Sequence, residues 1–263
     1  MTIYSAGCPT VLLDADAIIY PIGFVAASNG FDAAWACEQV DKKYEMLLAS
    51  LYEQGITKYH PTMYSYFTGS GSPKYRDQFH NVVPYKAKRK LATRPKPQWI
   101  SEMIDHVGTY GIGSVGVSSA TWGEADDEIA RDARLLREED VDYIIVHTDK
   151  DLNQIPGLHV NLKDPSKFYS IDTVMGLRCK YGQILSGDSA DDIPGLPGWG
   201  KVKAYDLVMS CDSETELFDK TLEKYIEVMV DKGQSMDFIT DYYYETANLV
   251  HLRTAEDDCW SPP

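Results

Sequence analysis

The sequence predicts an α/β protein with a mainly parallel sheet flanked by helices. Apolar runs at 10–14 and 142–147 have the length of buried strands, and aspartates stand at or just after their ends. Between them, the segments 31–54 and 123–136 carry apolar residues at helical spacing. Strands that alternate with helices are typical of a parallel sheet with helical connections.

In the first half of the chain, the strand at 10–14 precedes the helix at 31–54, which we expect Gly55 to end. A second strand is predicted at 62–67, and it leads into a loop rich in glycine and serine. Prolines interrupt the basic segment that follows, so that segment does not form one rigid helix.

In the second half, a helix is predicted to begin at 97–107, and 123–136 forms a helix with acids in its first turn, where the helix dipole favours them. The strand at 142–147 stops at the polar turn 148–151. From Asp188 onward the chain is predicted to be helical, with helices at 203–209, 214–230 and 236–252.

Length and composition describe an ordinary globular protein. The 263 residues give room for one large domain, or for a domain with a smaller appendage. No apolar run approaches the ~18 residues of a membrane span, and we see no secretory signal pattern. The five cysteines lack CxxC spacing and the histidines lack HExxH spacing, so we expect reduced thiols, a cytoplasmic protein and no zinc site.

The net charge of −15 argues at first against a nucleic-acid partner, but the charge is unevenly distributed. Between Lys74 and Lys96 there are eight basic residues, opposed only by Asp77. From Asp206 to the end there are fourteen acidic and four basic residues. A basic patch within an acidic chain indicates a local partner for that patch.

Four groups of acids occupy similar places in the predicted architecture: two follow strands, one begins a helix and one precedes a glycine-rich turn. They are Asp14 with Asp16, Asp149 with Asp151, Glu124 with Asp126 and Asp127, and Asp188 with Asp191 and Asp192. Ligands bind where the carboxyl ends of parallel strands meet, and carboxylates gathered there repel one another unless cations neutralise them. Oxygen ligands select Mg²⁺ or Mn²⁺, and this many acids predict two ions.

Each group also has an ordinary interpretation when it is taken alone. The stretch GEADDE makes a good helix N-terminus, TDKD an Asx-type turn and SGDSADD a solvated loop. The coincidence of four groups, three of them beside predicted buried elements, favours a metal site.

The stretch YKAKRK at 85–90 predicts an electrostatic grip on phosphate, with Tyr85 available to stack on a base. A solubilising patch is the ordinary alternative, but a chain of net charge −15 gains no solubility from concentrated cations.

The stretch GDSADDIPGLPGWGKVKA at 187–204 predicts a second phosphate contact. Glycines at 195, 198 and 200 permit a tight turn whose backbone N–H groups can face a phosphate at the start of a helix, where Lys201 and Lys203 add charge. A turn that only packs Trp199 into the core is the alternative.

Five of these stretches occur in the order found in one family. They are LLDADAIIY, PYKAKRK, WGEADDEIA, HTDKDLNQIP and LSGDSADDIPGLPGWGKVKA, which together span roughly residues 10 to 210. The chain resembles the bacteriophage 5′→3′ exonucleases and flap endonucleases, and the 5′-nuclease domains of bacterial DNA polymerases. Each motif is modest alone, whereas five in order are specific.

The resemblance implies a PIN-like nuclease core at 1–185 with a helical arch at about 80–100, and a helix-three-turn-helix and C-terminal helical region at 186–263. It implies hydrolysis of DNA phosphodiester bonds near a 5′ end, nick or flap by two Mg²⁺ or Mn²⁺ ions, as in DNA replication, and a K⁺ at the helix-three-turn-helix. An RNA–DNA hybrid is a further implied substrate.

The site residues implied by the resemblance fall into three groups. The metal ligands are Asp14, Glu124, Asp126, Asp127, Asp149, Asp151, Asp188 and Asp191. Lys86 and Arg89 match the arch cations at the scissile phosphate, with Tyr85 beside them, and the duplex contacts are Gly198, Gly200, Lys201 and Lys203.

Two positions depart from the family pattern. Gly69 stands where the family often has an acid after the second strand, so Asp16 or water would complete that ligand set, and Asp192 stands where asparagine is frequent. Two other functions stay open: a haloacid-dehalogenase-like phosphatase, suggested by Asp14 and Asp16, and a nucleic-acid-binding protein without catalysis. The phosphatase would not explain PYKAKRK or the glycine-rich turn.

Overall fold

The structure is a computed structural model, and it describes residues 8–58, 61–68, 75–79, 81–83, 85–86, 97–110, 115–119 and 123–263. The chain divides into two compact units. Unit 1 comprises Met1–Pro73, Thr93–Leu152 and Gly157–Ser170, and unit 2 comprises Lys74–Ala92, Asn153–Pro156 and Ile171–Pro263. This division differs from the boundary that we predicted between residues 185 and 186. Residues 74–92, which hold most of the basic segment, and residues 171–185 belong to the same unit as the C-terminal helices.

Unit 1 is built on a sheet. Within the part of the chain that the structure describes, six strands have the order β3-β2-β1-β4-β5-β6. They are β1 (Thr10–Asp14), β2 (Met63–Phe67), β3 (Val115–Ser119), β4 (Tyr143–His147), β5 (Gly157–Asn161) and β6 (Phe168–Ile171). The pairs β1–β2, β1–β4, β2–β3 and β4–β5 are all parallel, which confirms the predicted α/β class and mainly parallel sheet.

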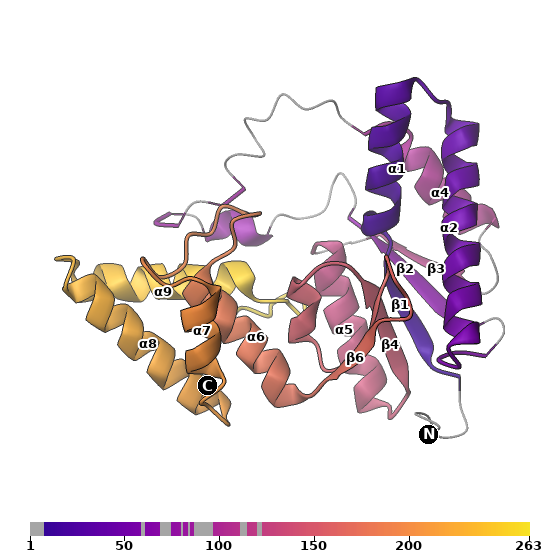
Figure 1. The fold of residues 1–263 in the computed structure, drawn as a ribbon. Helices are drawn as coiled ribbons and strands as arrows, with labels where there is room; N and C mark the ends of the chain where they lie inside the picture. The colour runs from indigo at the N-terminus through magenta and orange to yellow at the C-terminus, as the bar shows by residue number, and fades with distance from the viewer. Residues whose placement is uncertain are drawn as a thin grey trace. The chain divides into compact units, whose positions relative to one another are not determined.

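Helices cover both faces of this sheet (Figure 1). They are α1 (Asp16–Asn29), α2 (Ala33–Glu53), α4 (Ile100–Tyr110) and α5 (Ala125–Glu138). Alternate residues of β1 point to opposite faces, and Val11 and Leu13 join the core beneath α1, α2 and α4. Leu12 is fully buried but outside that core, and α5 packs against β1 and β2. The central strand β1 is therefore buried on both sides, as is typical of a parallel sheet covered by helices.

Unit 2 contains the short 3₁₀ helix η1 (Tyr75–Gln78) and helices α6 (Thr173–Ser186), α7 (Lys201–Val208), α8 (Glu214–Val230) and α9 (Met236–Val250). Its core is rich in tyrosine, and each phenolic O–H needs a partner when it is buried. Tyr225 donates to the carbonyl of Ile184 at 2.5 Å, and the hydroxyls of Tyr243 and Thr221 are 2.7 Å apart.

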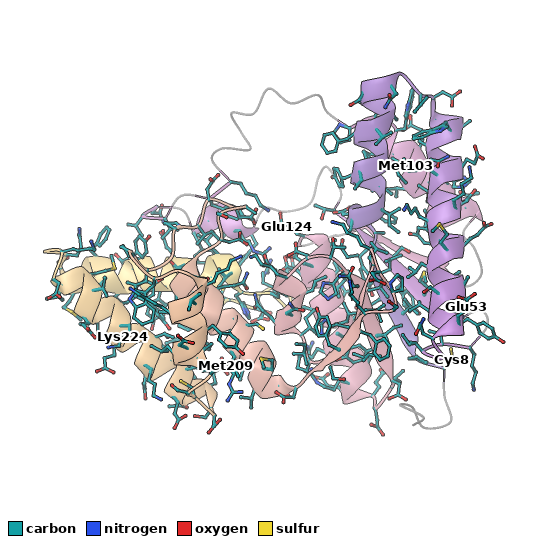
Figure 2. All side chains as sticks on the ribbon, in the orientation of Figure 1. Cys8, Glu53, Met103, Glu124, Met209 and Lys224 are labelled. Atoms are coloured by element: carbon teal, nitrogen blue, oxygen red, sulfur yellow. The ribbon has the colours of Figure 1, made fainter. Side chains whose placement is uncertain are left out.

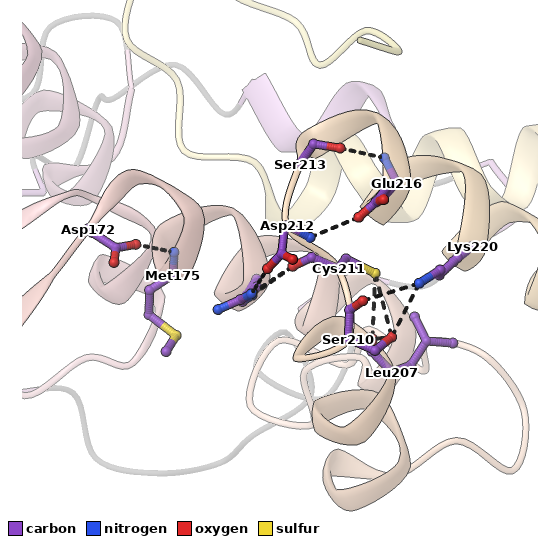
Figure 3. A network of polar contacts seen from close by, with 10 residues as sticks. Asp172, Met175, Leu207, Ser210, Cys211, Asp212, Ser213, Glu216 and Lys220 are labelled. Carbon is purple, nitrogen blue, oxygen red and sulfur yellow. Dashed lines mark hydrogen bonds and ion pairs between the residues drawn. The ribbon is translucent and has the colours of Figure 1, made fainter.

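A polar network fixes the turn between α7 and α8 (Figure 3). The carbonyl of Cys211 accepts hydrogen bonds from the Arg178 guanidinium, at 3.0 and 2.7 Å. The Ser213 hydroxyl caps α8 by accepting from the N–H of Glu216, and Asp172 caps α6 in the same way through Met175. These caps explain why both helices begin where they do.

Two α-helices and three strands of the described structure were not predicted from the sequence. They are α1, α6, β3, β5 and β6. Helix α1 contains Pro21 and buries one face, but its exposed side includes Phe24 and Val25, so it lacks a clear polar face. Strand β6 is largely exposed and has no alternating apolar pattern.

Candidate metal and nucleic-acid site

The predicted strand-end carboxylates lie at one edge of the sheet in unit 1. Asp14 is the last residue of β1, and β1 pairs in parallel with β4, with Leu13 opposite Val146. Asp149 follows the end of β4 by two residues. Since neighbouring parallel strands end at the same edge, the sheet itself brings these two acids together.

The charges at this edge interact strongly. Burial raises the pKa of Asp14 to about 7, and repulsion from Asp16 and Asp149 adds to that effect, although backbone N–H groups of Ala17 and Asp16 oppose it. Burial likewise raises the pKa of Asp16, and Glu124 adds repulsion while hydrogen bonds from Thr68 act against it. Carboxylates from β1, β4 and α5 therefore share one electrostatic environment, which a cation would stabilise.

The start of α5 is joined to the same edge through Thr68. The backbone N–H of Thr68 donates to both oxygens of Asp16, at 3.2 and 3.1 Å. The Thr68 hydroxyl accepts from the N–H of Ala125 at 3.1 Å, next to Glu124, which is labelled in Figure 2. One threonine thus ties the end of β2 to an acid of α1 and to the first residue of α5.

Asp127 also has a structural role, because it caps the N-terminus of α5. It is fully buried, and its Oδ2 accepts from the N–H of Glu124 at 3.0 Å, which completes a capping box. A Cβ at Gly123 would lie 2.8 Å from that oxygen, so the turn before the helix requires glycine. The metal-ligand role of Asp127 stays a prediction, beside this capping contact.

Asp149 and Asp151 form the predicted turn after β4: Asp149 Oδ1 accepts from the N–H of Asp151 at 2.9 Å. The residues that hold this turn were not foreseen from the sequence. The Nδ1 of His147 lies 2.5 Å from the carbonyl oxygen of Asp149, and its Nε2 lies 2.8 Å from the Nδ1 of His159. A carbonyl only accepts, so the Nδ1 of His147 carries a proton.

Neutral His147 then accepts at Nε2 from His159. Burial lowers the pKa of His147, against the opposing effect of the Asp149 carbonyl, and this favours the neutral ring. The two histidines come from β4 and β5, where the register places Asn161 opposite His147 and His159 opposite Ile145. No spacing along the chain would reveal the pair.

Among the described residues, no three His, Cys, Asp or Glu side chains form a group that could already hold a metal ion. The acids at the sheet edge are near enough to shift one another's pKa, yet they do not converge to coordination distance. The donor set, all oxygen, fits a hard divalent ion.

In unit 2 the acids of the predicted glycine-rich stretch lie on a closed loop after α6. Asp188 is 6% exposed, and its backbone exchanges two hydrogen bonds with Ile193, at 2.7 and 2.8 Å. A Cβ at Gly195 would lie 2.3 Å from the nitrogen of Gly187, and Gly195 has a φ of +64°. Gly195 therefore closes the loop that presents Asp188 and Asp191.

Lys86 is attached to this loop. Its backbone N–H donates to the carbonyl of Asp191 at 2.7 Å, and its Nζ is 3.7 Å from Asp191 Oδ2. Tyr85, in contrast, is only 6% exposed and belongs to the core of unit 2. Its ring packs inside the unit, and the base-stacking role of Tyr85 stays a prediction beside this packing. Arg89 and Gly69 lie outside the described residues.

The predicted duplex contacts gather at the start of α7. Lys201 and Lys203 are exposed on its first turn, Gly200 is the N-cap residue, and the Lys203 Nζ donates to the carbonyl of Gly198 at 3.2 Å. Gly198 has a φ of +82°, which favours glycine, whereas Gly200 has an ordinary φ of −88°. Trp199 is partly buried against the core, so the packing interpretation of that residue also holds.

No helix in the described parts of the chain is both long and apolar enough to cross a bilayer.

No protein-family model matches the chain. Among curated proteins, it is 32% identical over 143 residues to the flap endonuclease Xni of Shewanella baltica (strain OS155), covering 51% of this chain and 53% of that protein. It is 26% identical over 250 residues to a 5′-3′ exonuclease of Buchnera aphidicola subsp. Baizongia pistaciae, covering 90% and 77%. The chain thus spans about half the length of the flap endonucleases that it matches.

Among solved structures, the fold is similar to that of a T5 5′-exonuclease with divalent metal ions (zinc) bound, with a TM-score of 0.61 at 13% identity, over 94% of this chain and 90% of that one. It is also similar to a variant of the bacteriophage T5 D15 flap endonuclease in a complex with DNA and metal ions, with a TM-score of 0.53 at 13% identity, over 94% and 90%. The structural likeness confirms the fold, and the sequence relatives carry the names that the motifs predicted. The chain is therefore similar in sequence to proteins named as 5′ nucleases, and similar in fold to a 5′-exonuclease.

Proposed function

We propose that this protein is a structure-specific 5′ nuclease, a 5′→3′ exonuclease and flap endonuclease that hydrolyses DNA phosphodiester bonds. The observation that carries the proposal is the buried carboxylate of Asp14 at the edge of the sheet, whose pKa is raised first by burial and then by repulsion from Asp16 and Asp149. A carboxylate whose pKa is raised in this way gains most from a neighbouring cation, and the curated relatives are named for nuclease activity.

The proposed metal ligands are all carboxylates. In unit 1 they are Asp14, Glu124, Asp126, Asp127, Asp149 and Asp151, and in unit 2 they are Asp188 and Asp191. Bound Mg²⁺ or Mn²⁺, two ions in this proposal, would supply Lewis-acid polarisation of the scissile phosphate and an activated water. The ordering of the Asp149 turn by His147 and of Glu124 by Asp127 supports the assignment, because ligand groups need fixed positions. A K⁺ at the loop before α7 is part of the same proposal.

The proposed substrate is duplex DNA with a 5′ end, a nick or a flap, and RNA–DNA hybrids are a further substrate. Lys86 would neutralise charge that develops on the phosphoryl oxygens, and Arg89 would assist it. Lys201 and Lys203, exposed at the start of α7, would hold the phosphate backbone together with the amides near Gly198 and Gly200. Action in the cytoplasm is part of the same proposal.

The test is incubation with Mg²⁺ and a 5′-labelled duplex that carries a flap or a nick. Release of short oligonucleotides supports the nuclease, release of phosphate alone supports a phosphatase, and a gel shift without cleavage supports a binding protein. Asp149→Ala should abolish release, since it removes a ligand at the exposed end of the coupled group.

The matched control is Glu38→Gln on the surface of α2, where Glu38 pairs only with a lysine one turn away in the described ion pairs. This variant should cleave as the wild type does. Full activity of folded Asp149→Ala, or equal activity in EDTA and in Mg²⁺, would contradict the proposed mechanism.

A further inference from the structure

Glu245 of α9 is a nearly buried acid that binds a run of backbone amides. The exposed fraction of Glu245 is only 9%. Oε1 accepts from the N–H of Asn81 at 3.0 Å, and Oε2 accepts from the N–H groups of Val82 and Val83 at 2.8 and 2.9 Å. A buried carboxylate is costly unless hydrogen bonds satisfy it, and three amide donors on one carboxylate do so.

The amides concerned have few alternatives. Residues 81–83 lie outside every helix and strand, so neither a helix nor a sheet supplies carbonyls for their N–H groups. Buried backbone amides are almost always paired. Because Val83 is 1% exposed, the carboxylate of Glu245 is what allows this non-repetitive segment to enter the core of unit 2.

The anchored segment leads directly to Lys86. Only two residues separate Val83 from Lys86, so their Cα atoms are at most about 10 Å apart. Tyr85 is buried in the same core, and Lys86 has a left-handed φ of 48° with its N–H held by the carbonyl of Asp191. So short a tether transmits a shift at residues 81–83 to Lys86.

A second set of contacts holds the other end of the segment to α9 and the residues after it. The Tyr75 hydroxyl donates to Asn248 Oδ1 at 3.0 Å, and Arg76 donates to the carbonyls of Leu249 and His251 at 3.1 and 2.9 Å. The Arg253 guanidinium lies 3.8 Å from the centre of the Tyr75 ring. Residues 75–76 and residues 81–83 are therefore both held by α9 or by the residues that follow it. Of these two sets of contacts, the one made by Glu245 is nearer to Lys86 along the chain.

We propose that Glu245 is a positioning residue for Lys86: its carboxylate holds residues 81–83 on α9 so that the lysine ammonium stands where the reacting phosphate binds. The inference rests on the proposed nuclease function for its effect on rate. It assigns a function to α9, which lies beyond the motifs that identify the family. Displacement of a charged group by about 1 Å can cost on the order of 100-fold in rate.

The experiment compares single-turnover cleavage of a flapped duplex by the wild type, Glu245→Gln, Lys86→Ala and the double variant. Glutamine keeps the size of the side chain but replaces one acceptor oxygen by a donor, which faces N–H groups. We expect Glu245→Gln to lower the cleavage rate roughly 10- to 100-fold with DNA affinity nearly unchanged. In the Lys86→Ala background, Glu245→Gln should lower the cleavage rate only slightly further, because Glu245 affects the rate by positioning Lys86.

Hydrogen exchange supplies a readout that does not depend on catalysis. The amides of Asn81, Val82 and Val83 should exchange faster in Glu245→Gln, while those of β1 and β4 stay protected. Thr221→Val is the matched control: it removes a buried hydrogen bond to Tyr243 in the same unit, and it should leave both the exchange at 81–83 and the cleavage rate unchanged.

Unchanged exchange at 81–83, or an equal loss of rate with and without Lys86, would overturn the proposal. If Glu245→Gln does not fold, Glu245→Asp keeps the charge on a shorter stem, and it should show an intermediate loss of rate and protection. A wild-type protein that cleaves no substrate would refute the nuclease function, while the exchange measurement would still decide whether Glu245 anchors the segment.

Discussion

Removing the charge of Asp14 should stabilise the metal-free protein at neutral and alkaline pH while it abolishes cleavage. Burial, with repulsion from Asp16 and Asp149, raises the pKa of Asp14 from 3.8 to about 7. A raised pKa means that the folded state disfavours the carboxylate. The contribution of Asp14 to the free energy of unfolding is therefore most favourable below about pH 4, where the group is protonated in both states. This contribution is lost as the pH rises through about 7.

The magnitude follows from the size of the shift. The difference between about 7 and 3.8 is about three pKa units, or roughly 4 kcal/mol at 1.36 kcal/mol per unit. Asparagine also accepts hydrogen bonds from the backbone of Ala17 and Asp16 less strongly than the carboxylate does, so the net gain is smaller. We expect Asp14→Asn to unfold at a temperature higher by roughly 4–8 °C at about pH 8, which corresponds to about 2 kcal/mol.

The assay is thermal unfolding in EDTA at about pH 8 and about pH 4, followed by a titration with Mg²⁺. The variant should be more stable than the wild type at the higher pH and similar at the lower one. Mg²⁺ should raise the unfolding temperature of the wild type more than that of the variant, since bound ligand stabilises the folded state. Equal unfolding temperatures of the two proteins in EDTA at the higher pH would refute the reasoning.

Three further predictions concern other contacts. Gly195→Ala should cost more than about 3 kcal/mol of unfolding free energy in chemical denaturation, because its Cβ meets backbone at 2.3 Å, whereas Gly198→Ala, with open space around it, should cost only roughly 1–2 kcal/mol. Burial opposes ionisation of Asp258, but hydrogen bonds from His251 and Thr254 hold its pKa well below the usual value, so its stabilisation is present at neutral pH and is lost in acid; Asp258→Asn should flatten the acid limb of a melting-temperature profile. Lys86→Ala should lower single-turnover cleavage by roughly 10²–10³ with a smaller change in DNA affinity, and a larger loss of affinity would assign Lys86 to binding alone.

The parts of the fold that the sequence predicted are those set by local pattern. Strands β1 and β4 are continuous apolar runs, and α5 begins with acids and keeps one apolar face, so each is recognisable within its own segment. Helix α1 was missed because its exposed side carries the apolar residues Pro21, Phe24 and Val25, so no polar face gives the helical period.

The candidate site shows the same division. The aspartates after β1 and β4 could be placed together, because parallel strands end at one edge. The pairing of His147 with His159 depends on the register of β4 and β5, and the burial of Tyr85 depends on the assembly of the unit 2 core, whose other members lie far from it in the sequence. Glu245 resembled any other acid of an acidic C-terminal half, since its partners lie more than 160 residues earlier in the chain.

The interleaving of the two units has a consequence for synthesis on the ribosome. The chain passes between units at residues 73/74, 92/93, 152/153, 156/157 and 170/171, so neither unit is a continuous stretch. The first strands of the sheet emerge together with residues 75–86, whereas Glu245 and Asn248 emerge last. The segment 75–86 can therefore pack on α9 only after this final helix has been synthesised. A product terminated before α9 would contain Lys86 but lack Glu245, which we propose positions it.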